Sequence, residues 1–589
     1  QPYLRGIPDS VLFLYDTVPL ISETSKSVHP LDYDLSLAPV KRIEIVRGPG
    51  SVLWGPDAFA GIVNVVPMTG KDLDGAETGI LYGDGDGEEY GAYANLGHDA
   101  GLWDAFLSVS GRQREGNDRA ANLVRFWENG DGLADPDDRF GKERPEESRY
   151  FEVSGRFAYQ DWFALSARIS DNRNPYVLSS RAEDLESSDR DLSWLEGRSE
   201  PMGFVKVEAS KDLERNSALR FTGFYSWLRS EIEVVDRTLT QNERAAYGEL
   251  IYDRSFLAGS GLLTGGLSYR SKRIEDAPIW DSFVPDFFGE GNAFFLPLLR
   301  EEDYHTKLWS LFGQYSHKIG NMDFWIGLRY DNHDAYRDHV SYNAGVSWSP
   351  SREWILKLLY GTAYRTPFAR QLLEEDEPEM EKIRSLSAQV VWEPSERGSL
   401  SLVGFGSRID NHRIEDPFAG LSSENRQDFW GAEVEGRLLV RPDLELAANL
   451  TLIENSGPDE TFSVLDRFEP VDGEIVPVFV DLSHPYERGP GTLFNLTALW
   501  KPHERFSTFL RLGYISSRDL IHPKEGKIGS ASGRWIADLS ATVRDVFWKD
   551  LDLILSVRNL TDNDYETPGT YSMIEGDPFS VVMTLRKRW

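Results

Sequence analysis

The sequence predicts an all-β transmembrane barrel of about 22 antiparallel strands, preceded by a small N-terminal domain. Three observations predict this class. From about residue 75 onward, apolar residues alternate with polar ones, as they do in half-buried strands. The links between these stretches are alternately short and long. No run of about 18 apolar residues occurs that could form a spanning helix, whereas a spanning strand needs only about 9–11 residues with one face towards lipid.

The alternation is clearest in the last stretch, FSVVMTLRKRW, from Phe579 to Trp589. One face carries Phe579, Val581, Met583 and Leu585, and the other is mostly polar. The stretches WIADLSATVRD, LDLILSVRN and TLFNLTALW repeat this pattern. Each therefore predicts a strand with one apolar face.

The lengths of the links separate the two ends of the predicted barrel. Short links include residues 97–101, 318–321, 349–353 and 501–505, and long links include residues 114–149, 274–302 and 455–490. Tryptophans at strand ends, namely Trp354, Trp500, Trp535 and Trp589, would form the aromatic girdles of a membrane barrel. The alternative is a soluble all-β protein in which these aromatic residues belong to the core.

Composition excludes several classes of function. The formal net charge is −33, which argues against a nucleic-acid partner, because phosphates are bound by a basic face. The chain has no cysteine, so disulfides, thiolate metal sites and thiol nucleophiles are excluded. Neither of the motifs G-x-S-x-G and H-E-x-x-H occurs. We therefore expect no enzyme, although the triad of a barrel hydrolase need not be local in sequence.

We expect two domains. Residues 71–589, at roughly 23 residues per strand and link, hold about 22 strands, which lies within the range of bacterial barrels. A barrel of that width has a lumen that is either filled or open. Residues 1–70 mix proline, glycine and short β-branched runs and do not resemble membrane strands. They are expected to sit in the lumen.

The stretch RIEIVRGPGSVLWGPDAFAGIVNVV, residues 42–66, carries the motif positions Arg47, Gly48, Pro49, Gly55 and Gly61. It closely resembles the end of the plug domain of TonB-dependent outer-membrane receptors. Trp54 stands where that family usually has tyrosine. The upstream stretch, residues 4–22, resembles another plug segment of the family through Arg5, Gly6, Asp16 and Pro19.

Barrel segments at residues 360–374, 430–446 and 557–567 resemble elements of the same family, so the resemblance covers essentially the whole chain. It implies a location in the outer membrane of a Gram-negative bacterium. It also implies import of a scarce, large ligand, for which we expect a ferric siderophore, by TonB-driven displacement of the plug. A cobalamin-type corrinoid is the alternative ligand. A structural or adhesive barrel that binds a surface partner without transport is the alternative function.

The resemblance further implies that TonB contacts a segment upstream of residue 1, and that a surface lipoprotein caps some barrels of the family. Family plug arginines pair with lumen-facing barrel glutamates. Arg5 and Arg47 are the candidates here, with Glu433 and Glu435, which share one strand face. The alternative is that both arginines bond to local carbonyl groups.

Two long links carry candidate ligand sites. In the acidic link, Asn129, Asp131, Asp135, Asp137 and Asp138 partly imitate a calcium loop, although a solvated acidic turn explains them too. No cofactor is otherwise expected. In the aromatic link, the residues that would cover a ligand or contact a partner are Trp280, Phe283, Phe287, Phe288, Phe294 and Phe295. His333, His339 and His412 lie near strand ends without the spacing of metal ligands.

Overall fold

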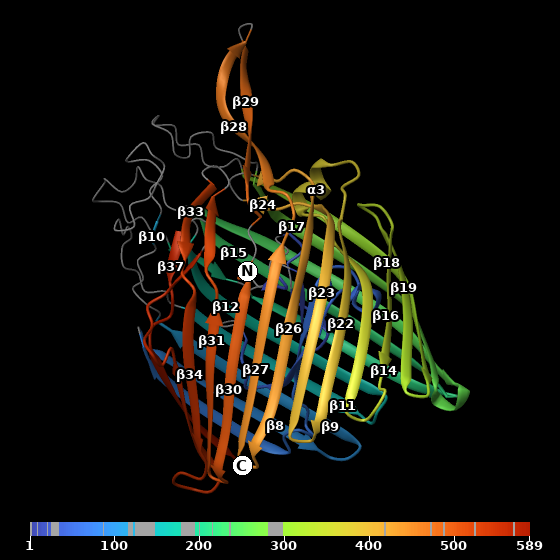
Figure 1. Cartoon of the computed structure of the whole chain (residues 1–589), viewed down its shortest axis with the longest axis vertical. Helices are drawn as coiled ribbons and strands as arrows, with labels where there is room; N and C mark the ends of the chain where they lie inside the picture. The colour runs from blue at the N-terminus through green and yellow to red at the C-terminus, as the bar shows by residue number, and fades with distance from the viewer. Residues whose placement is uncertain are drawn as a thin grey trace.

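The computed structural model describes residues 3–8, 10–20, 22–24, 35–85, 87–115, 122–123, 148–177, 195–199, 201–214, 216–234, 237–280, 299–416, 420–471, 474–486, 489–522, 526–568 and 572–589. Its main body is a closed antiparallel barrel, in which β38 pairs with β7 and closes the sheet (Figure 1). β13 and β14 pair with the same neighbour, β12, and form one strand. The barrel thus has 22 strands, which confirms the predicted fold class.

The strands of the barrel are β7 (Gly75–Asp84), β8 (Glu89–Asp99), β9 (Trp103–Arg114), β11 (Ser148–Tyr159), β12 (Phe163–Val177), β13 (Leu195–Ser199) with β14 (Met202–Leu213), β15 (Ser217–Val234), β16 (Arg237–Phe256), β17 (Gly261–Trp280), β18 (Leu299–Ile319), β19 (Met322–His333), β20 (His339–Trp348), β21 (Trp354–Arg365), β22 (Glu381–Ser395), β23 (Gly398–His412), β26 (Asn425–Arg441), β27 (Leu444–Asn455), β30 (Thr492–His503), β31 (Phe506–Ile515), β34 (Arg534–Val543), β35 (Leu551–Arg558) and β38 (Ser580–Arg588).

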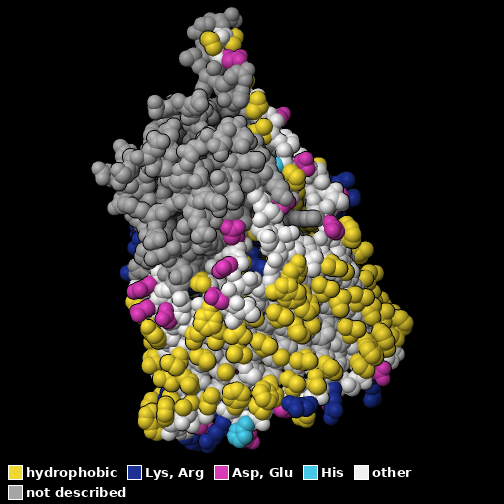
Figure 2. All heavy atoms as spheres, turned by 60° about the vertical axis from the view of Figure 1, so that its left-hand side comes forward, with side chains coloured by type: hydrophobic (Ala, Val, Ile, Leu, Met, Phe, Trp, Pro, Cys, Tyr) yellow, Lys and Arg dark blue, Asp and Glu magenta, His cyan; other side chains and the backbone are white. Residues whose placement is uncertain are grey.

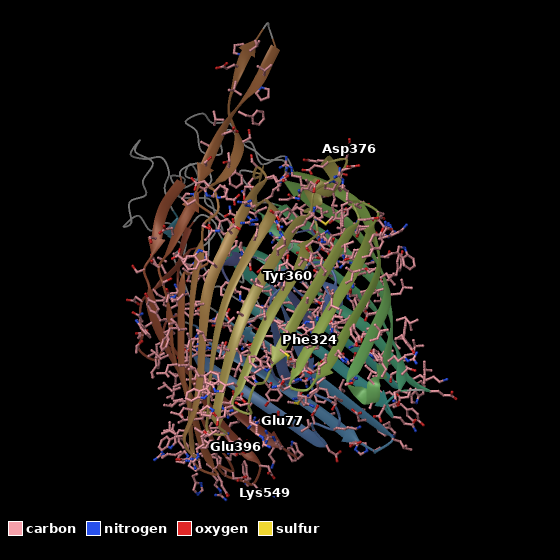
Figure 3. The ribbon with its side chains drawn as sticks, turned by 45° about the vertical axis from the view of Figure 1, so that its right-hand side comes forward. Glu77, Phe324, Tyr360, Asp376, Glu396 and Lys549 are labelled. Carbon is pink, nitrogen blue, oxygen red and sulfur yellow. The ribbon has the colours of Figure 1, made fainter. Side chains whose placement is uncertain are left out.

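The two rims of the barrel differ, as the link lengths predict. At the short-turn rim the strands are joined by tight turns such as residues 100–102, 320–321 and 442–443. The opposite, long-loop rim carries α3 (Ala369–Glu374) and the hairpin of β28 (Glu460–Val471) and β29 (Glu474–His484), which stands beyond the barrel (Figure 1). Figure 3 marks Asp376 at the long-loop rim, and Glu396 and Lys549 at the short-turn rim.

Two of the predicted links are wrong in detail. The link expected at residues 274–302 is shorter, because β17 continues to Trp280 and β18 starts at Leu299. The link expected at residues 455–490 contains the β28–β29 hairpin. The long-loop rim also carries two short pairs of strands, β24 (Glu415–Asp416) with β25 (Gly420–Leu421) and β32 (Arg518–His522) with β33 (Gly526–Ala531). A small three-stranded sheet joins them, in which β37 (Ser572–Glu575) pairs with both β10 (Asn122–Leu123) and β36 (Glu566–Pro568). Period-two patterns of so few residues do not stand out in a sequence.

The outer wall presents an apolar band. Hydrophobic side chains cover the middle of the barrel, while charged side chains gather at its lower edge (Figure 2). Leu311 and Ile326 are about three-fifths exposed, at 62% and 61%, as expected for residues that face lipid. At the short-turn rim, Trp354 stacks on Trp392 with ring centroids 5.9 Å apart. Among the described residues, no helix is both long and apolar enough to cross a membrane.

The N-terminal segment forms a small separate sheet. It contains β3 (Val11–Tyr15), β4 (Val18–Pro19), β5 (Val40–Arg47) and β6 (Gly61–Pro67) in the order β4-β3-β6-β5, and β3 runs parallel to β6. A hairpin of β1 (Tyr3–Leu4) and β2 (Ile7–Pro8) precedes the sheet, and the short helix α2 (Ser51–Trp54) lies between β5 and β6. The domain boundary expected at residues 70–71 lies in the link between β6 and β7.

The motif glycines allow this sheet to pack closely. A Cβ atom on Gly61 would lie 2.7 Å from the carbonyl oxygen of Val46 on the paired strand, so only glycine fits there. Gly48 has a φ of +101° and Gly55 a φ of +81°, which is the left-handed region that other residues rarely adopt. Pro49 lies against Gly361 of the barrel wall. These residues form the tight link between β5 and β6.

Candidate functional site

The small sheet lies inside the barrel, because it contacts opposite walls of the lumen. Arg5 pairs with Glu433 on β26, and Asp16 pairs with Lys206 on β14. Ser22 and Thr24 bind to Glu243 on β16, while Asp57 binds to Thr366 just beyond β21. The segment therefore occupies the place of a plug, and polar side chains make much of its contact with the wall.

The four residues expected to form plug–barrel ion pairs lie together. Nε of Arg5 donates to Oε1 of Glu433 at 2.8 Å, and Nη1 of Arg47 donates to Oε2 of the same carboxylate at 2.8 Å. Arg47 also pairs with Glu435. The side chains of Arg5 and Glu433 are 6% and 5% exposed, whereas those of Arg47 and Glu435 are about 40% exposed. A buried pair that is broken on one side is costly, so the Arg5–Glu433 pair is the stronger anchor.

A second anchor lies across the lumen on β12. The fully buried Arg168 pairs with Glu152 at 2.9 Å, and its guanidinium lies 4.6 Å from the centre of the Tyr15 ring. The Tyr15 hydroxyl donates to Glu152 at 3.3 Å. Burial raises the pKa of Tyr15, so the hydroxyl remains a neutral donor. This anchor ties the end of β3 to the wall.

A third anchor holds the segment after β4. Oγ of Ser22 donates to Glu243 at 2.5 Å, the amide of Glu23 donates to the same carboxylate at 3.0 Å, and Oγ1 of Thr24 donates to it at 3.2 Å. Glu23 in turn pairs with Lys272 on β17. One barrel carboxylate therefore holds three consecutive plug residues.

A cavity of about 760 Å³ lies between the plug and the wall formed by β9, β11, β12 and β14–β19. It reaches the turn at residues 160–162 on the short-turn rim. At its other end the lining includes Gly55 of the plug and Arg270 of β17. A larger cavity of about 1220 Å³ separates the β5 side of the plug from β31, β34, β35, β38 and β7–β9. The plug therefore packs closely against only part of the wall.

On the long-loop side of the smaller cavity, Arg270 and four other polar side chains lie close together between the plug and the wall. This polar cluster consists of Asp57, Arg270, Tyr336, His339 and Tyr364. Oδ2 of Asp57, Nη2 of Arg270 and Nε2 of His339 are buried and make no hydrogen bond within the described part of the chain, while the hydroxyls of Tyr336 and Tyr364 interact with each other. Buried polar groups are usually paired, so three such atoms in one place are unusual.

The members of the polar cluster come from five different segments. The Tyr336 ring stacks on His333 with centroids 3.7 Å apart, and the His339 ring lies 4.5 Å from that of Tyr364. The carboxylates that interact electrostatically with Arg270 are Glu23 and Asp57. Tyr336 lies in the loop between β19 and β20, and burial raises its pKa, so its hydroxyl stays protonated.

The long-loop rim covers the polar cluster with apolar side chains. Leu372 of α3 and Met380 pack on Tyr336 and Tyr364. On its other side α3 packs through Ala369 against Ile274, Ala277 and Ile279 of β17. The cover is thus one short helix, which crosses from β21 to β17, together with Met380.

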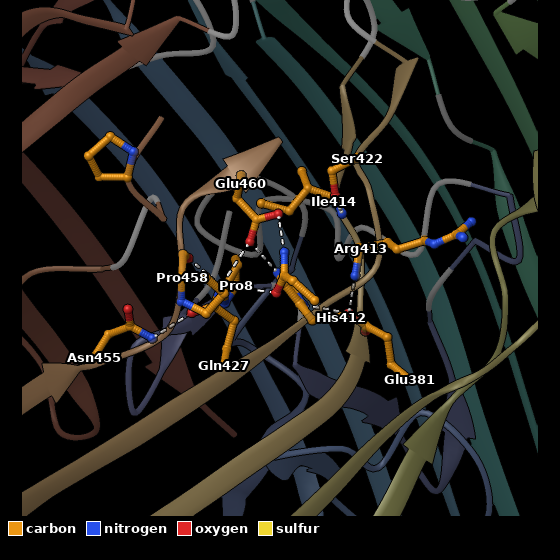
Figure 4. A network of polar contacts seen from close by, with 12 residues as sticks. Pro8, Glu381, His412, Arg413, Ile414, Ser422, Gln427, Asn455, Pro458 and Glu460 are labelled. Carbon is orange, nitrogen blue, oxygen red and sulfur yellow. Dashed lines mark hydrogen bonds and ion pairs between the residues drawn. The ribbon is translucent and has the colours of Figure 1, made fainter. Parts of the chain in front are cut away.

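A separate polar network ties the base of the β28–β29 hairpin to the barrel (Figure 4). Nδ1 of His412 lies 2.6 Å from Glu381, and Nε2 lies 3.1 Å from Glu460. Glu381 also pairs with Arg365, whose guanidinium lies 5.3 Å from the centre of the plug residue Phe59. Because both imidazole nitrogens face carboxylates, His412 carries both protons, and the buried charges alternate in sign.

Several predicted residues lie outside the described residues. The acidic link with Asn129, Asp131, Asp135, Asp137 and Asp138 is one such case, and the aromatic residues Phe283, Phe287, Phe288, Phe294 and Phe295 are another. Trp280 ends β17, but its side chain is not among those described. Calcium binding and aromatic contacts with a ligand therefore stay predictions.

Sequence reasoning missed the polar cluster and the Glu243 anchor. A usable signal exists for part of them, since Glu243 and Arg270 are charged residues at lumen-facing positions of period-two strands, as Glu433 is. Asp57 and Tyr336 lie in loops, where no periodicity marks them. Only the fold brings them together.

Comparison with known proteins places the chain in a family. A model of the TonB dependent receptor-like β-barrel matches residues 89–560, and a model of the TonB-dependent receptor plug domain matches residues 1–62. In sequence the chain is 20% identical over 404 residues to the vitamin B12 transporter BtuB of Vibrio vulnificus. That match covers 66% of this chain and spans 57% of the length of the curated relative.

Solved structures share the fold over the whole chain. The FrpB iron transporter from Neisseria meningitidis has a TM-score of 0.72 at 13% identity, covering 100% of this chain and 93% of its own. The siderophore receptor PirA from Acinetobacter baumannii has a TM-score of 0.72 at 13% identity, covering 100% of this chain and 92% of its own. The 22-stranded barrel, its internal plug and both family models lead to one conclusion: the chain belongs to the TonB-dependent receptors of the Gram-negative outer membrane.

Proposed function

We propose that this protein is an energy-coupled importer of a ferric siderophore. The ligand enters from the long-loop rim, which faces the outside of the cell in barrels of this kind. TonB then drives displacement of the plug, and the ligand passes to the periplasm. The protein performs no chemistry on the ligand.

The observation that carries this proposal is that ion pairs and hydrogen bonds join the plug to the wall of the barrel, for example at Arg5, Asp16 and Ser22. A hydrogen bond within a protein contributes only about 0.5–1.5 kcal/mol net, because water replaces it when it breaks. Besides one apolar cluster that joins Phe59 of the plug to Ile383 of the wall, ion pairs and hydroxyl groups hold the plug, and the cavity beside it already reaches the short-turn rim.

Uptake by cells tests the proposal. The full native chain is expressed in a Gram-negative host that lacks its own siderophore receptors, and radioactive iron is supplied as a catecholate or a hydroxamate chelate. We expect accumulation that stops when a protonophore is added or when the host lacks TonB. Accumulation of neither chelate would refute iron import.

Two alternatives give different results in the same assay. The sequence relative is a vitamin B12 transporter, so labelled cyanocobalamin is tested in parallel. Energy-dependent accumulation of cobalamin alone would assign a corrinoid as the ligand. Binding of a cell-surface protein without accumulation of any probe would favour the structural or adhesive barrel.

A further inference from the structure

We propose that a basic patch on the lipid-facing wall of β15–β18 binds the phosphate groups of a glycolipid in the outer leaflet of the membrane. The basic patch consists of Arg229 on β15, Arg244 on β16, Arg273 on β17 and Lys307 on β18, and all four residues are exposed. This inference goes beyond the proposed function, because it concerns the outside of the barrel and does not depend on the imported ligand.

Strand pairing brings the four cations of the basic patch together. Arg244 lies directly opposite Arg273 in the register of β16 and β17. Arg229 lies diagonal to Arg244 on one side, and Lys307 lies diagonal to Arg273 on the other. Directly opposite residues have Cβ atoms about 4.5–5.5 Å apart, and like charges at such positions destabilise a sheet. An anion that lies between the two arginines would remove this repulsion.

Two of these cations have no carboxylate partner within the described part of the chain. Arg244 and Lys307 form no ion pair there, whereas Arg229 pairs with Glu231 and Arg273 pairs with Glu275. The two glutamates lie two residues closer to the long-loop rim than their arginines. The charges nearest the apolar band are therefore cations, although the chain as a whole has a net charge of −33.

Another part of the wall shows how a similar pair of arginines is neutralised within the chain. Arg384 on β22 lies directly opposite Arg408 on β23. There each arginine has its own aspartate, since Arg384 pairs with Asp410 at 2.5 Å and Arg408 with Asp428 at 2.6 Å. The basic patch lacks this compensation, so it retains positive charge for a partner from outside the chain.

The wall next to the basic patch is suited to lipid. Tyr269 and Trp309 lie opposite each other on the short-turn side of the patch, with ring centroids 4.4 Å apart, and the exposed Leu267 and Leu311 follow. Aromatic side chains collect at the boundary between the hydrocarbon and the headgroups of a membrane. The patch lies on the long-loop side of this boundary, which is the depth of the outer-leaflet headgroups.

Small residues leave room for a headgroup between the aromatic rings and the arginines. Ala246 and Ser271 lie opposite each other there, and a Cβ atom on Gly248 would meet no other atom within 4 Å. Arginine and lysine are the residues that bind phosphate groups, and arginine does so with two parallel hydrogen bonds. The outer leaflet of a Gram-negative outer membrane consists largely of lipid A, a phosphorylated glycolipid. Its phosphates would contact the cations and its acyl chains the apolar wall, a contact that free phosphate cannot make.

Native mass spectrometry of the purified full chain in detergent tests the proposal, because it counts bound lipid molecules. We expect the double variant Arg244→Gln with Arg273→Gln to bind bisphosphorylated lipid A at least about tenfold more weakly, which corresponds to about 1.4 kcal/mol. We expect its melting temperature without lipid to stay the same or to rise, because the two arginines no longer repel each other. Arg244→Gln alone breaks no ion pair and repeats the test with the smallest change to the barrel.

Arg384→Gln with Arg408→Gln is the matched control. It removes the same charge from two arginines that also lie opposite each other but are already paired with aspartates. We expect this variant to bind bisphosphorylated lipid A as tightly as the unchanged chain does. Lipid A without phosphate groups serves as a second probe and inorganic phosphate as a third, and we expect both to bind more weakly.

Several outcomes would overturn the proposal. It fails if the Arg244 and Arg273 variants bind bisphosphorylated lipid A as tightly as the unchanged chain does. Equal losses in the matched control would show that any exposed arginine contributes and that no defined site exists. Equal affinity for lipid A without phosphate groups would refute phosphate recognition. Displacement of the lipid by an equal concentration of inorganic phosphate would assign the basic patch to the free ion instead.

Discussion

Replacement of Glu433 by glutamine tests whether the plug is held by a buried ion pair. The change keeps the shape of the side chain but removes the charge that neutralises Arg5, whose side chain is 6% exposed. Removal of one partner of a buried pair costs about 3–5 kcal/mol, because the other charge stays buried alone. Arg5 retains Ser387 at 3.2 Å and the ring of Phe405, with its centre 4.2 Å away. We therefore expect a loss near the lower end of that range.

Glu435→Gln is the matched control on the same strand. Its partner Arg47 is 41% exposed, and an exposed pair contributes at most about 1 kcal/mol. Hydrogen exchange of plug peptides, measured by mass spectrometry, gives the free energy of local opening for β1–β2 and β5. A loss of about 3 kcal/mol corresponds to more than a hundredfold faster exchange in Glu433→Gln. Equal exchange rates in the two variants would refute the assignment of Arg5–Glu433 as the principal anchor.

Three further predictions concern other parts of the chain. Gly61→Ala should destabilise the plug far more than Gly248→Ala on β16, because its Cβ would meet a backbone oxygen at 2.7 Å while that of Gly248 meets no atom within 4 Å; hydrogen exchange of β5 and β6 checks this. His412→Gln should leave the buried Glu460 without its cation, while Glu381 keeps Arg365, at a cost of about 3 kcal/mol, and should speed protease cleavage of the β28–β29 hairpin in particular. If the acidic link binds calcium, Asp135→Asn with Asp137→Asn should abolish the heat of calcium binding in calorimetry, whereas no heat in the unchanged chain would dismiss the site.

The sequence predicts the barrel well, because each spanning strand must present one face to lipid. That requirement imposes a period of two on every strand, as the final stretch from Phe579 to Trp589 illustrates. It says much less about structures beyond the membrane. The β28–β29 hairpin was expected as a link, since it has no lipid-facing side that would enforce a pattern.

The plug–barrel pairs were within reach of sequence reasoning for the same reason. Glu433 and Glu435 occupy alternate positions of one strand, so both face the lumen, where an arginine of the plug can meet them. The family resemblance supplied the arginines. The partners of Asp16 and Ser22, on β14 and β16, had no such guide, because many lumen-facing polar residues could have served equally well.

By itself, the sequence determined the class of fold and the approximate number of strands, because lipid contact imposes a period of two on every spanning strand. The family and the glycines of the plug link came from the resemblance of its motifs to those of TonB-dependent receptors. Only the tertiary structure decided which polar groups meet across the lumen. Asp57, Arg270, Tyr336, His339 and Tyr364 belong to five segments spread over some three hundred residues of chain. Closure of the barrel around the plug brings them together, because their strands and loops become neighbours only in the closed sheet.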